Sequence, residues 1–309
     1  MALQRKDLLG LKGVTAEEIK EILDTAAQLK PILATGSKKT PHLAGRSIVT
    51  LFYENSTRTR MSFELASKYM SAAAANISAS ASSVAKGETL IDTGRTLDSM
   101  GTDVIIIRHP MGGAPHLLAR HVKSSVVNAG DGMNEHPTQA LLDMFTMREK
   151  FGDLTGLKVT IVGDVLHSRV ARSNIWGLKT MGAQVVLAAP STLMPVELER
   201  TGVQVTNCVE DAVREADVVM ALRIQRERQK GGLLASVSEY NEFYAVNQLR
   251  LSMAKPGALV MHPGPMNRGV EINSDVAEGN QSVINQQVTN GVAVRMAVLY
   301  LLTRKNGRA

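Results

Sequence analysis

Short apolar segments alternate along the chain with longer amphipathic segments, and this alternation determines the predicted fold. Apolar runs of strand length occur at residues 47–53, 102–107, 123–129, 157–163, 183–189, 203–207, 217–222 and 258–261. Buried strands separated by helical segments are typical of parallel sheets covered by helices on both faces. The pattern therefore predicts an α/β protein built from doubly wound parallel sheets.

Signals for helix boundaries support the same interpretation. The segment TAEE at residues 15–18 has the form of a capping box, which predicts the start of a helix. Pro137 occupies a favoured first position of another helix, which Gly152 would end, and a last helix is expected over about residues 283–303. The segment 71–89 is rich in Ala and Ser, and its composition alone predicts a flexible linker.

Size and composition permit two ordinary domains and narrow the range of functions. The chain has 309 residues, of which 44% are hydrophobic and 21% charged, as in other globular proteins. Its net charge is +6, but the 35 basic residues are dispersed among 29 acidic ones, and only 4% of residues are aromatic. A nucleic-acid partner is therefore not expected. Small anionic substrates account for the basic excess equally well.

The chain lacks sequence signals for export, membrane insertion and metal binding. The first residues, MALQRKDLLGLKG, contain no signal-peptide apolar region, and the apolar stretch GVAVRMAVLYLL is too short to span a bilayer. The single cysteine, Cys208, is expected to be a small buried residue at a strand end. With one cysteine and no export signal, we expect a cytoplasmic protein. Because the histidines form no zinc-type cluster, no metal or cofactor is expected.

The sequence ENSTRTR at residues 54–60 raises a question of charge. Its Asn, Ser and Thr residues are good N-cap types, so a helix is expected to begin here. Arg58 and Arg60 would then lie in the first turn, where the helix dipole disfavours each cation by about 0.3–1 kcal/mol. A bound anion such as phosphate would explain why positive charge is placed there.

Further polar side chains follow the predicted strands, and ligands of such folds bind at the carboxyl ends of strands. Because these ends converge within a sheet, their arginines indicate a ligand set with several negative charges, such as a phosphate and a carboxylate. The turn after residue 162 lacks the glycine spacing of a dinucleotide site, so NAD binding is not expected. The candidate residues are Arg58, Arg108, His136, Gln139, Arg169, Arg223, Gln225 and the segment His262–Pro265.

Four motifs together resemble those of the carbamoyltransferases. The stretch STRTR at residues 56–60 resembles their phosphate loop, and HPTQ at 136–139 resembles a second shared motif. The segment ALRIQRER at 221–228 resembles the aspartate branch, in which an Arg and a Gln two residues apart bind the substrate side chain. HPGPMNRG at 262–269 is similar to many bacterial aspartate enzymes, and the resemblance covers nearly the whole chain.

The resemblance implies a reaction and a domain organisation. A carbamoyl group would pass from carbamoyl phosphate to the amine of L-aspartate, giving N-carbamoyl-L-aspartate and phosphate, an early step of de novo pyrimidine biosynthesis. Residues 1–139 would bind carbamoyl phosphate, with a C-terminal helix at about 286–309 packing back on them, and residues 140–285 would bind aspartate. Interdomain helices would join the two domains.

The resemblance also implies roles for individual residues. Ser82 and Lys86 match a loop that reaches into a neighbouring subunit, which implies a homotrimer with shared active sites. Relatives occur as bare trimers, with regulatory chains or with dihydroorotase, and the sequence does not choose among these. The expected catalytic residues are Thr59, Lys86, Arg108 and His136. Carbamoyl phosphate would be bound by Ser56, Thr57, Arg58, Thr59, Ser82, Arg108, His136, Gln139, Gly264 and Pro265, and aspartate by Lys86, Arg169, Arg223 and Gln225.

Three alternative functions are weighed against this one. A carbamoyltransferase for another amino acid, such as ornithine, would need a site for a cationic side chain, which Arg223 would repel. A non-catalytic family member would act as an assembly partner, although the catalytic positions that can be placed are intact. An NAD-dependent oxidoreductase would require the missing glycine fingerprint.

Overall fold

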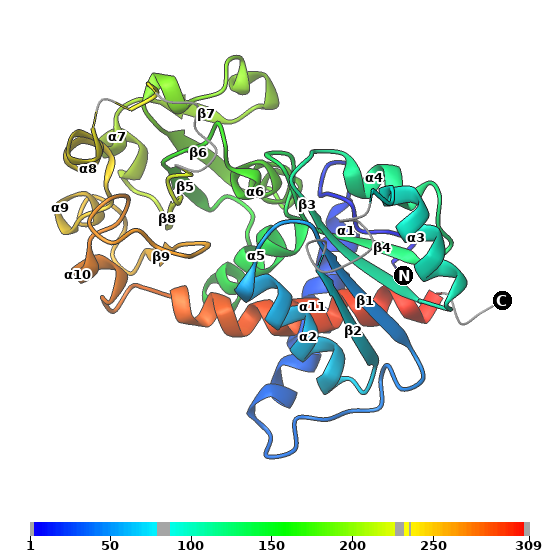
Figure 1. The fold of residues 1–309 in the computed structure, drawn as a ribbon. Helices are drawn as coiled ribbons and strands as arrows, with labels where there is room; N and C mark the ends of the chain where they lie inside the picture. Colours follow the sequence, from blue (N-terminus) through cyan, green and yellow to red (C-terminus); the bar gives the residue numbers. More distant parts are fainter. Residues whose placement is uncertain (1–2, 79–86, 226–231, 235, 306–309) are drawn as a thin grey trace. The chain divides into compact units, whose positions relative to one another are not determined.

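The chain folds into two compact units, each built on one parallel sheet (Figure 1). The computed structural model describes residues 3–78, 87–225, 232–234 and 236–305. Unit 1 comprises Met1–Phe145 and Thr289–Ala309, and unit 2 comprises Thr146–Val288. The predicted fold class, two doubly wound parallel-sheet domains with helices, is confirmed.

Unit 1 contains a four-stranded sheet in the order β2-β1-β3-β4, and each neighbouring pair is parallel. Its strands are β1 (Ser47–Phe52), β2 (Ala73–Ser78), β3 (Val104–His109) and β4 (Ser125–Asp131). Its helices are α1 (Ala16–Leu29), α2 (Thr57–Tyr69), α3 (Leu90–Ser99) and α4 (Ala114–Ala119), and α5 (Pro137–Phe151) and α11 (Ile284–Lys305) carry the chain between the units.

The predicted capping box at the start of α1 is confirmed. The backbone N–H of Glu18 donates to Thr15 Oγ1 at 3.3 Å, and the backbone N–H of Thr15 donates to Glu18 Oε2 at 3.1 Å. Arg5 also donates to both carboxylate oxygens of Glu18 at 2.8 Å. This hydrogen bond from Arg5 is the main reason why the pKa of Glu18 lies below its usual value.

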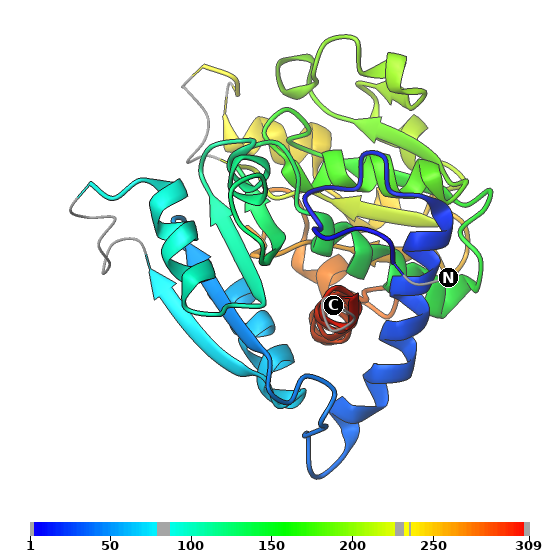
Figure 2. The same cartoon turned by 90° about the vertical axis from the view of Figure 1, so that its right-hand side faces the viewer.

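Helices cover both faces of the unit 1 sheet. Side chains along a strand alternate between these faces, so each strand packs against helices on both sides. Val49 and Leu51 of β1 pack with Leu97 of α3 and Leu118 of α4. Phe52, the next residue of β1, points to the other face, where the Arg60 guanidinium of α2 lies 5.3 Å from its ring centroid. Figure 2 shows α3 on one side of this sheet, with α2 and α11 on the other.

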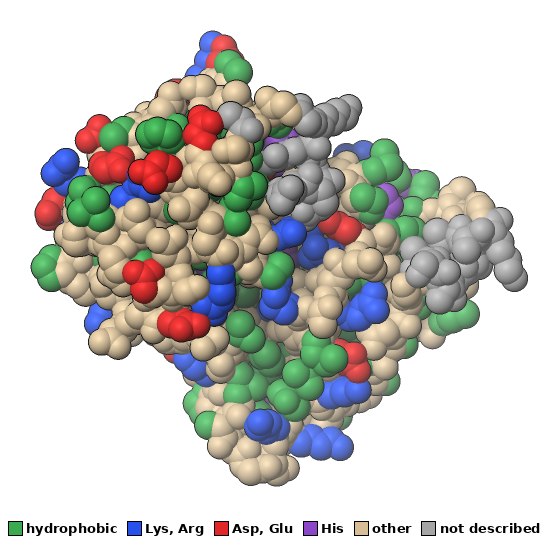
Figure 3. Space-filling view, turned by 60° about the vertical axis from the view of Figure 1, so that its left-hand side comes forward, with side chains coloured by type: hydrophobic (Ala, Val, Ile, Leu, Met, Phe, Trp, Pro, Cys, Tyr) green, Lys and Arg blue, Asp and Glu red, His purple; other side chains and the backbone are tan. Residues whose placement is uncertain are grey.

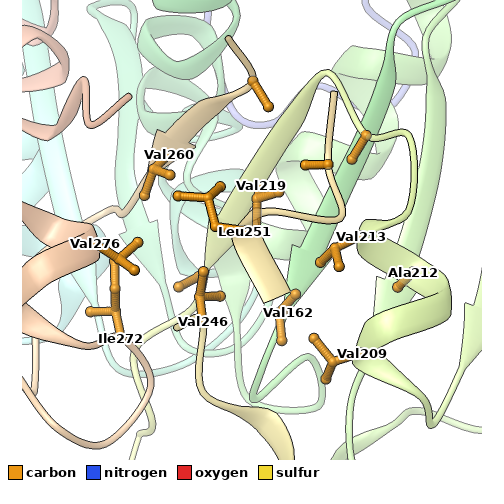
Figure 4. Close-up of a cluster of buried hydrophobic side chains, with 14 of the residues drawn as sticks. Val162, Val209, Ala212, Val213, Val219, Val246, Leu251, Val260, Ile272 and Val276 are labelled. Carbon is orange, nitrogen blue, oxygen red and sulfur yellow. The ribbon is translucent and has the colours of Figure 1, made fainter. Parts of the chain in front are cut away.

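Unit 2 contains a five-stranded parallel sheet in the order β7-β6-β5-β8-β9. Val162, Val219 and Val260 of three adjacent strands form a buried cluster with Val209 and Leu251 from the covering helices (Figure 4). The strands are β5 (Lys158–Val162), β6 (Gln184–Ala188), β7 (Gln204–Thr206), β8 (Val218–Ala221) and β9 (Leu259–Met261). The helices are α6 (Arg169–Thr180), α7 (Val209–Val213), α8 (Val237–Tyr244), α9 (Gln248–Leu251) and α10 (Ser274–Ala277).

The linker predicted over residues 71–89 is wrong for its first part. Residues 73–78 form β2, which pairs in parallel with β1 from Ser47 opposite Ala73 to Phe52 opposite Ser78. β2 is an edge strand of the sheet, and its backbone pairing with β1 is enough to form a strand although its side chains are small. Residues 79–86 lie outside the described part of the chain.

The prediction of a buried Cys208 is also wrong. Its side chain is exposed, and the residue is the N-cap of α7. The reason is that β7 already ends at Thr206, whose Oγ1 accepts from the Cys208 backbone N–H at 3.1 Å. Cys208 therefore lies in a surface turn between strand and helix.

Surface charge is mixed on the face shown in Figure 3, where Asp and Glu side chains are scattered among Lys and Arg side chains. Over the described residues, none of the helices combines the length and apolar character required to cross a membrane. The same residues contain no cluster of three His, Cys, Asp or Glu side chains suited to a metal ion.

Candidate active site

The start of α2 places backbone N–H groups and Arg58 directly after β1. Ser56 is the N-cap residue, with an extended backbone and no capping hydrogen bond from its side chain, and the first turn contains no acidic residue. Arg58 is exposed and Thr59 is buried. Arg60 stacks on Phe52, so an aromatic face explains one of the two cations, and Arg58 is the one that suits an anionic ligand.

Arg108 lies beside this loop because β3 neighbours β1. Phe52 pairs with Arg108 in the parallel register, and the Tyr53 backbone N–H donates to the Arg108 carbonyl at 2.9 Å. The Arg108 Nη1 donates to the Ala129 carbonyl at 3.4 Å, and its Nε lies 3.5 Å from Glu54 Oε2. Glu54, an orienting partner for Arg108, was missed at the sequence level although it begins the ENSTRTR motif.

His136 is carried by a loop that a buried carboxylate holds in place. Asp131, at the end of β4, accepts the Gly113 backbone N–H at 2.7 Å and the Glu135 backbone N–H at 3.1 Å. Asn128 also donates to this carboxylate, at 2.7 Å. His136 follows directly, is buried, and immediately precedes α5.

Gln139 lies in the first turn of α5. Its Nε2 donates to Oδ1 of Asp143, one turn further along the helix, at 3.0 Å. Unit 1 therefore brings Ser56–Thr59, Arg108, His136 and Gln139 to the carboxyl ends of the adjacent strands β1, β3 and β4.

In unit 2, Asp164 joins the loop after β5 to the segment after β8. Its Oδ1 accepts the His167 backbone N–H at 3.1 Å and pairs with His167 Nδ1 at 2.8 Å. Its Oδ2 accepts the Gln225 backbone N–H at 3.3 Å. Arg169 is buried at the first position of α6, so one carboxylate positions both segments that carry candidate aspartate ligands.

Gly163 allows the β5 and β8 ends to approach closely. Its φ is +129°, and a Cβ at this position would lie 3.0 Å from the Leu222 carbonyl oxygen and 3.1 Å from the Tyr240 hydroxyl oxygen. Burial raises the pKa of Tyr240, whose hydroxyl therefore stays protonated. A larger residue at position 163 would therefore push the segment after β8, which contains Leu222 and Gln225, away from Asp164.

Glu271 holds the other side of the β8 segment. It accepts the Ile224 backbone N–H at 3.5 Å, the Asn267 backbone N–H at 2.5 Å and the His262 Nε2–H at 3.2 Å. The His262 Nδ1 in turn accepts the Gly264 backbone N–H at 2.8 Å. The carboxylate thus links the Arg223 segment to the loop that contains Gly264 and Pro265.

The strand order of unit 2 gathers the candidate residues of that unit. Arg169 follows β5, Arg223 and Gln225 follow β8, and Gly264 and Pro265 follow β9, which are neighbours in the sheet. Arg223 Nη1 donates to Gln225 Oε1 at 3.5 Å. Ser82 and Lys86, the two residues predicted to act in a neighbouring subunit, lie outside the described residues.

Comparison with protein families assigns both halves of the chain. Residues 6–149 match the aspartate/ornithine carbamoyltransferase carbamoyl-phosphate-binding domain. Residues 155–302 match the Asp/Orn-binding domain of the same family. The chain is 68% identical to the aspartate carbamoyltransferase catalytic subunit of Ruminiclostridium cellulolyticum, over 99% of this chain and 97% of that protein. It is also 68% identical to the same subunit of Acetivibrio thermocellus, over 99% and 98%.

Solved structures give the same family. Ornithine carbamoyltransferase from Pyrococcus furiosus superposes with a TM-score of 0.86 at 32% identity, covering 97% of this chain and 98% of that one. Aspartate transcarbamoylase from Trypanosoma cruzi, in complex with carbamoyl phosphate and aspartate, has a TM-score of 0.86 at 30% identity, covering 96% and 97%. The chain belongs to the aspartate/ornithine carbamoyltransferase family.

Proposed function

We propose that the residues at the two sets of strand ends carry out carbamoyl transfer from carbamoyl phosphate to L-aspartate. The products are N-carbamoyl-L-aspartate and phosphate, and the reaction is an early step of de novo pyrimidine biosynthesis. The names of the relatives at 68% identity support aspartate as the acceptor. The observation that carries the proposal is the Arg223–Gln225 pair held beside Asp164, because a guanidinium suits a side-chain carboxylate and repels the ammonium of ornithine.

The unit 1 residues act on carbamoyl phosphate. Backbone N–H groups at Ser56–Thr59 and the Arg58 guanidinium hold the phosphate group, to which Ser82 adds a hydroxyl. Thr59, Arg108 and His136 donate to the carbonyl oxygen, whose negative charge grows as the amine attacks. Gln139 and the carbonyls of Gly264 and Pro265 accept from the carbamoyl NH₂ group.

The unit 2 residues bind aspartate and aim its amine. Arg169 pairs with the α-carboxylate, Arg223 and Gln225 hold the β-carboxylate, and Lys86 adds positive charge near both substrates. The C–N bond forms, and the C–O bond breaks with its electron pair going to the leaving phosphate, which takes up the proton that the amine gives up. Holding two anions in this geometry removes much of the entropic barrier of the reaction. In this proposal residues 1–139 bind carbamoyl phosphate, and residues 140–285 bind aspartate.

The assembly in this proposal is a cytoplasmic homotrimer. Ser82 and Lys86 act in the site of a neighbouring subunit, so that a single chain lacks two of its ligands. A regulatory chain or a dihydroorotase would be an additional partner.

Formation of ureido product by the purified chain tests the proposal. With carbamoyl phosphate present, L-aspartate is expected to give product and L-ornithine is not. Product with ornithine alone would overturn the assignment of Arg223 and Gln225 while leaving the phosphate site intact. No product with either amino acid would overturn carbamoyl transfer by this chain alone.

A further inference from the structure

The Gln139–Asp143 hydrogen bond fixes which end of the Gln139 side-chain amide faces away from Asp143. A carboxylate only accepts hydrogen bonds, so the amide must turn its NH₂ toward Asp143. The distance from Gln139 Nε2 to Asp143 Oδ1 is 3.0 Å. Within the described residues, no hydrogen-bond donor engages Gln139 Oε1, so this acceptor is available to a ligand.

A buried cation, Arg295, interacts electrostatically with Asp143. Both Asp143 and Arg295 of α11 are buried, with relative exposures of 0% and 4%. Burial lowers the pKa of Arg295 to about 10, and the negative charge of Asp143 opposes that shift. Arg295 therefore stays protonated at neutral pH and stabilises the ionised form of Asp143, the form that can only accept.

The position of Arg295 is itself tightly constrained. Its Nη1 donates to Ser62 Oγ and to the Gly291 carbonyl, both at 3.0 Å, and its guanidinium carbon lies 5.1 Å from the Phe63 ring centroid. A Cβ added at Gly291 would come within 2.6 Å of Nη1. Figure 1 shows α11 running beside α2, which carries Ser62 and Phe63. The cation that favours the ionised form of Asp143 is thus fixed by the packing of unit 1.

We propose that Asp143 is a positioning residue that makes Gln139 an acceptor for the carbamoyl NH₂ group. The inference rests on the proposed function, in which Gln139 contacts that group. It adds a specificity: the site distinguishes carbamoyl phosphate from acyl phosphates of the same charge and size that carry a methyl group instead of NH₂. A reversed amide would place two donors against each other and lose this preference.

The test compares the binding of carbamoyl phosphate and acetyl phosphate by calorimetry. The quantity of interest is the ratio of the two dissociation constants in the intact chain and in the variant Asp143→Asn. An asparagine can donate to Gln139 Oε1 as readily as it accepts from Nε2, so the amide is no longer held one way. We expect the preference for carbamoyl phosphate to fall about 3- to 10-fold, the worth of one hydrogen bond. A general loosening of the fold would weaken the binding of both phosphates equally and leave the ratio of their dissociation constants unchanged.

Two comparisons make the result specific. Asp98→Asn is a matched control, because Asp98 is a carboxylate of unit 1 that accepts the Ser124 backbone N–H at 2.7 Å and contacts no candidate site residue. Its ratio should equal that of the wild type. In a Gln139→Leu background, Asp143→Asn should cause no further change in the ratio, because the two residues act through one contact.

Each outcome decides a separate question. If Asp143→Asn folds and keeps the wild-type ratio, or if the wild type does not discriminate at all, the inference is overturned. If Asp143→Asn alone does not fold, the double variant D143N/R295M removes the buried cation together with its partner, and its ratio is read in the same way. A wild type that binds neither phosphate would instead overturn the proposed function.

Discussion

The two sets of candidate residues are organised differently, although both lie at the carboxyl ends of parallel strands. In unit 1 the candidate phosphate ligands Ser56–Thr59 are consecutive, and the N-terminus of one helix presents them. In unit 2 the candidate aspartate ligands come from separate segments, to which the buried carboxylates Asp164 and Glu271 are hydrogen-bonded. In the proposed function, phosphate recognition therefore depends mainly on local backbone, and aspartate recognition depends on contacts between distant parts of the chain.

The two units therefore differ in how much their candidate ligands depend on other residues to hold them in place. A helix N-terminus forms wherever its turn forms, so the segment Ser56–Thr59 needs few supporting residues around it. A pair of guanidinium groups must be held at a fixed separation to bind two carboxylates of one small molecule. In unit 2 we expect Asp164 and Glu271, which are not among the candidate ligands, to set that separation.

The largest effect is expected at Arg58. Arg58→Ala should lower kcat/KM for carbamoyl phosphate by about 10²- to 10³-fold, the loss typical of one donor that binds charge in the transition state. Arg60→Ala is the matched control in the same turn, and it should change kcat/KM only a few-fold because Arg60 packs on Phe52. Steady-state kinetics on both variants provide the measurement. Equal losses would mean that the turn acts through its total charge.

A smaller effect is expected at Arg223. Arg223→Lys keeps the charge but removes the planar fork, so KM for aspartate should rise about 10- to 100-fold. The dissociation constant for carbamoyl phosphate, measured by calorimetry, should stay at its wild-type value. Arg200→Lys, an exposed cation of the same unit that pairs with Glu197 at 2.8 Å, should leave both quantities unchanged. A matching loss of carbamoyl phosphate binding in Arg223→Lys would contradict the separation of the two sets.

The smallest effect is expected at Glu271, which accepts hydrogen bonds from the segments that carry the candidate aspartate ligands but is not itself one of them. Glu271→Gln introduces a donor among groups that all donate to this position, so KM for aspartate should rise about 3- to 10-fold. The free energy of unfolding should fall by about 1–3 kcal/mol. Chemical denaturation and kinetics measure the two changes, and Glu278→Gln, at an exposed side chain, is the control. An unchanged KM in a destabilised Glu271→Gln would show that this carboxylate serves stability alone.

Much of the fold could be predicted, because strand and helix periods are local properties of the sequence. The alternation of apolar runs predicted every strand except β2, and TAEE predicted the start of α1 correctly. Strand β2 was missed because its sequence AAANIS has only one β-branched residue, and its pairing with β1 forms it. The position of Cys208 was missed because the end of β7 depends on where pairing with β6 stops.

Only those residues of the candidate site that stand in contiguous sequence motifs could be predicted. Arg58, His136 and Gln139 stand in short contiguous segments, so a reader of the sequence can find them. The supporting carboxylates could not be found in that way. Glu271 contacts the Ile224 backbone across 47 residues of sequence, and no periodicity encodes such a pairing.

The path of α11 has a consequence for the order in which the protein is made. The bond between Arg295 and Ser62 joins residues 233 positions apart, and it belongs to unit 1, whereas unit 2 is a continuous stretch ending at Val288. A ribosome therefore makes every residue of unit 2 before it makes the part of α11, from Thr289 onward, that belongs to unit 1. The nascent first unit must wait, with the face that α11 will cover still open to water, until the final residues emerge.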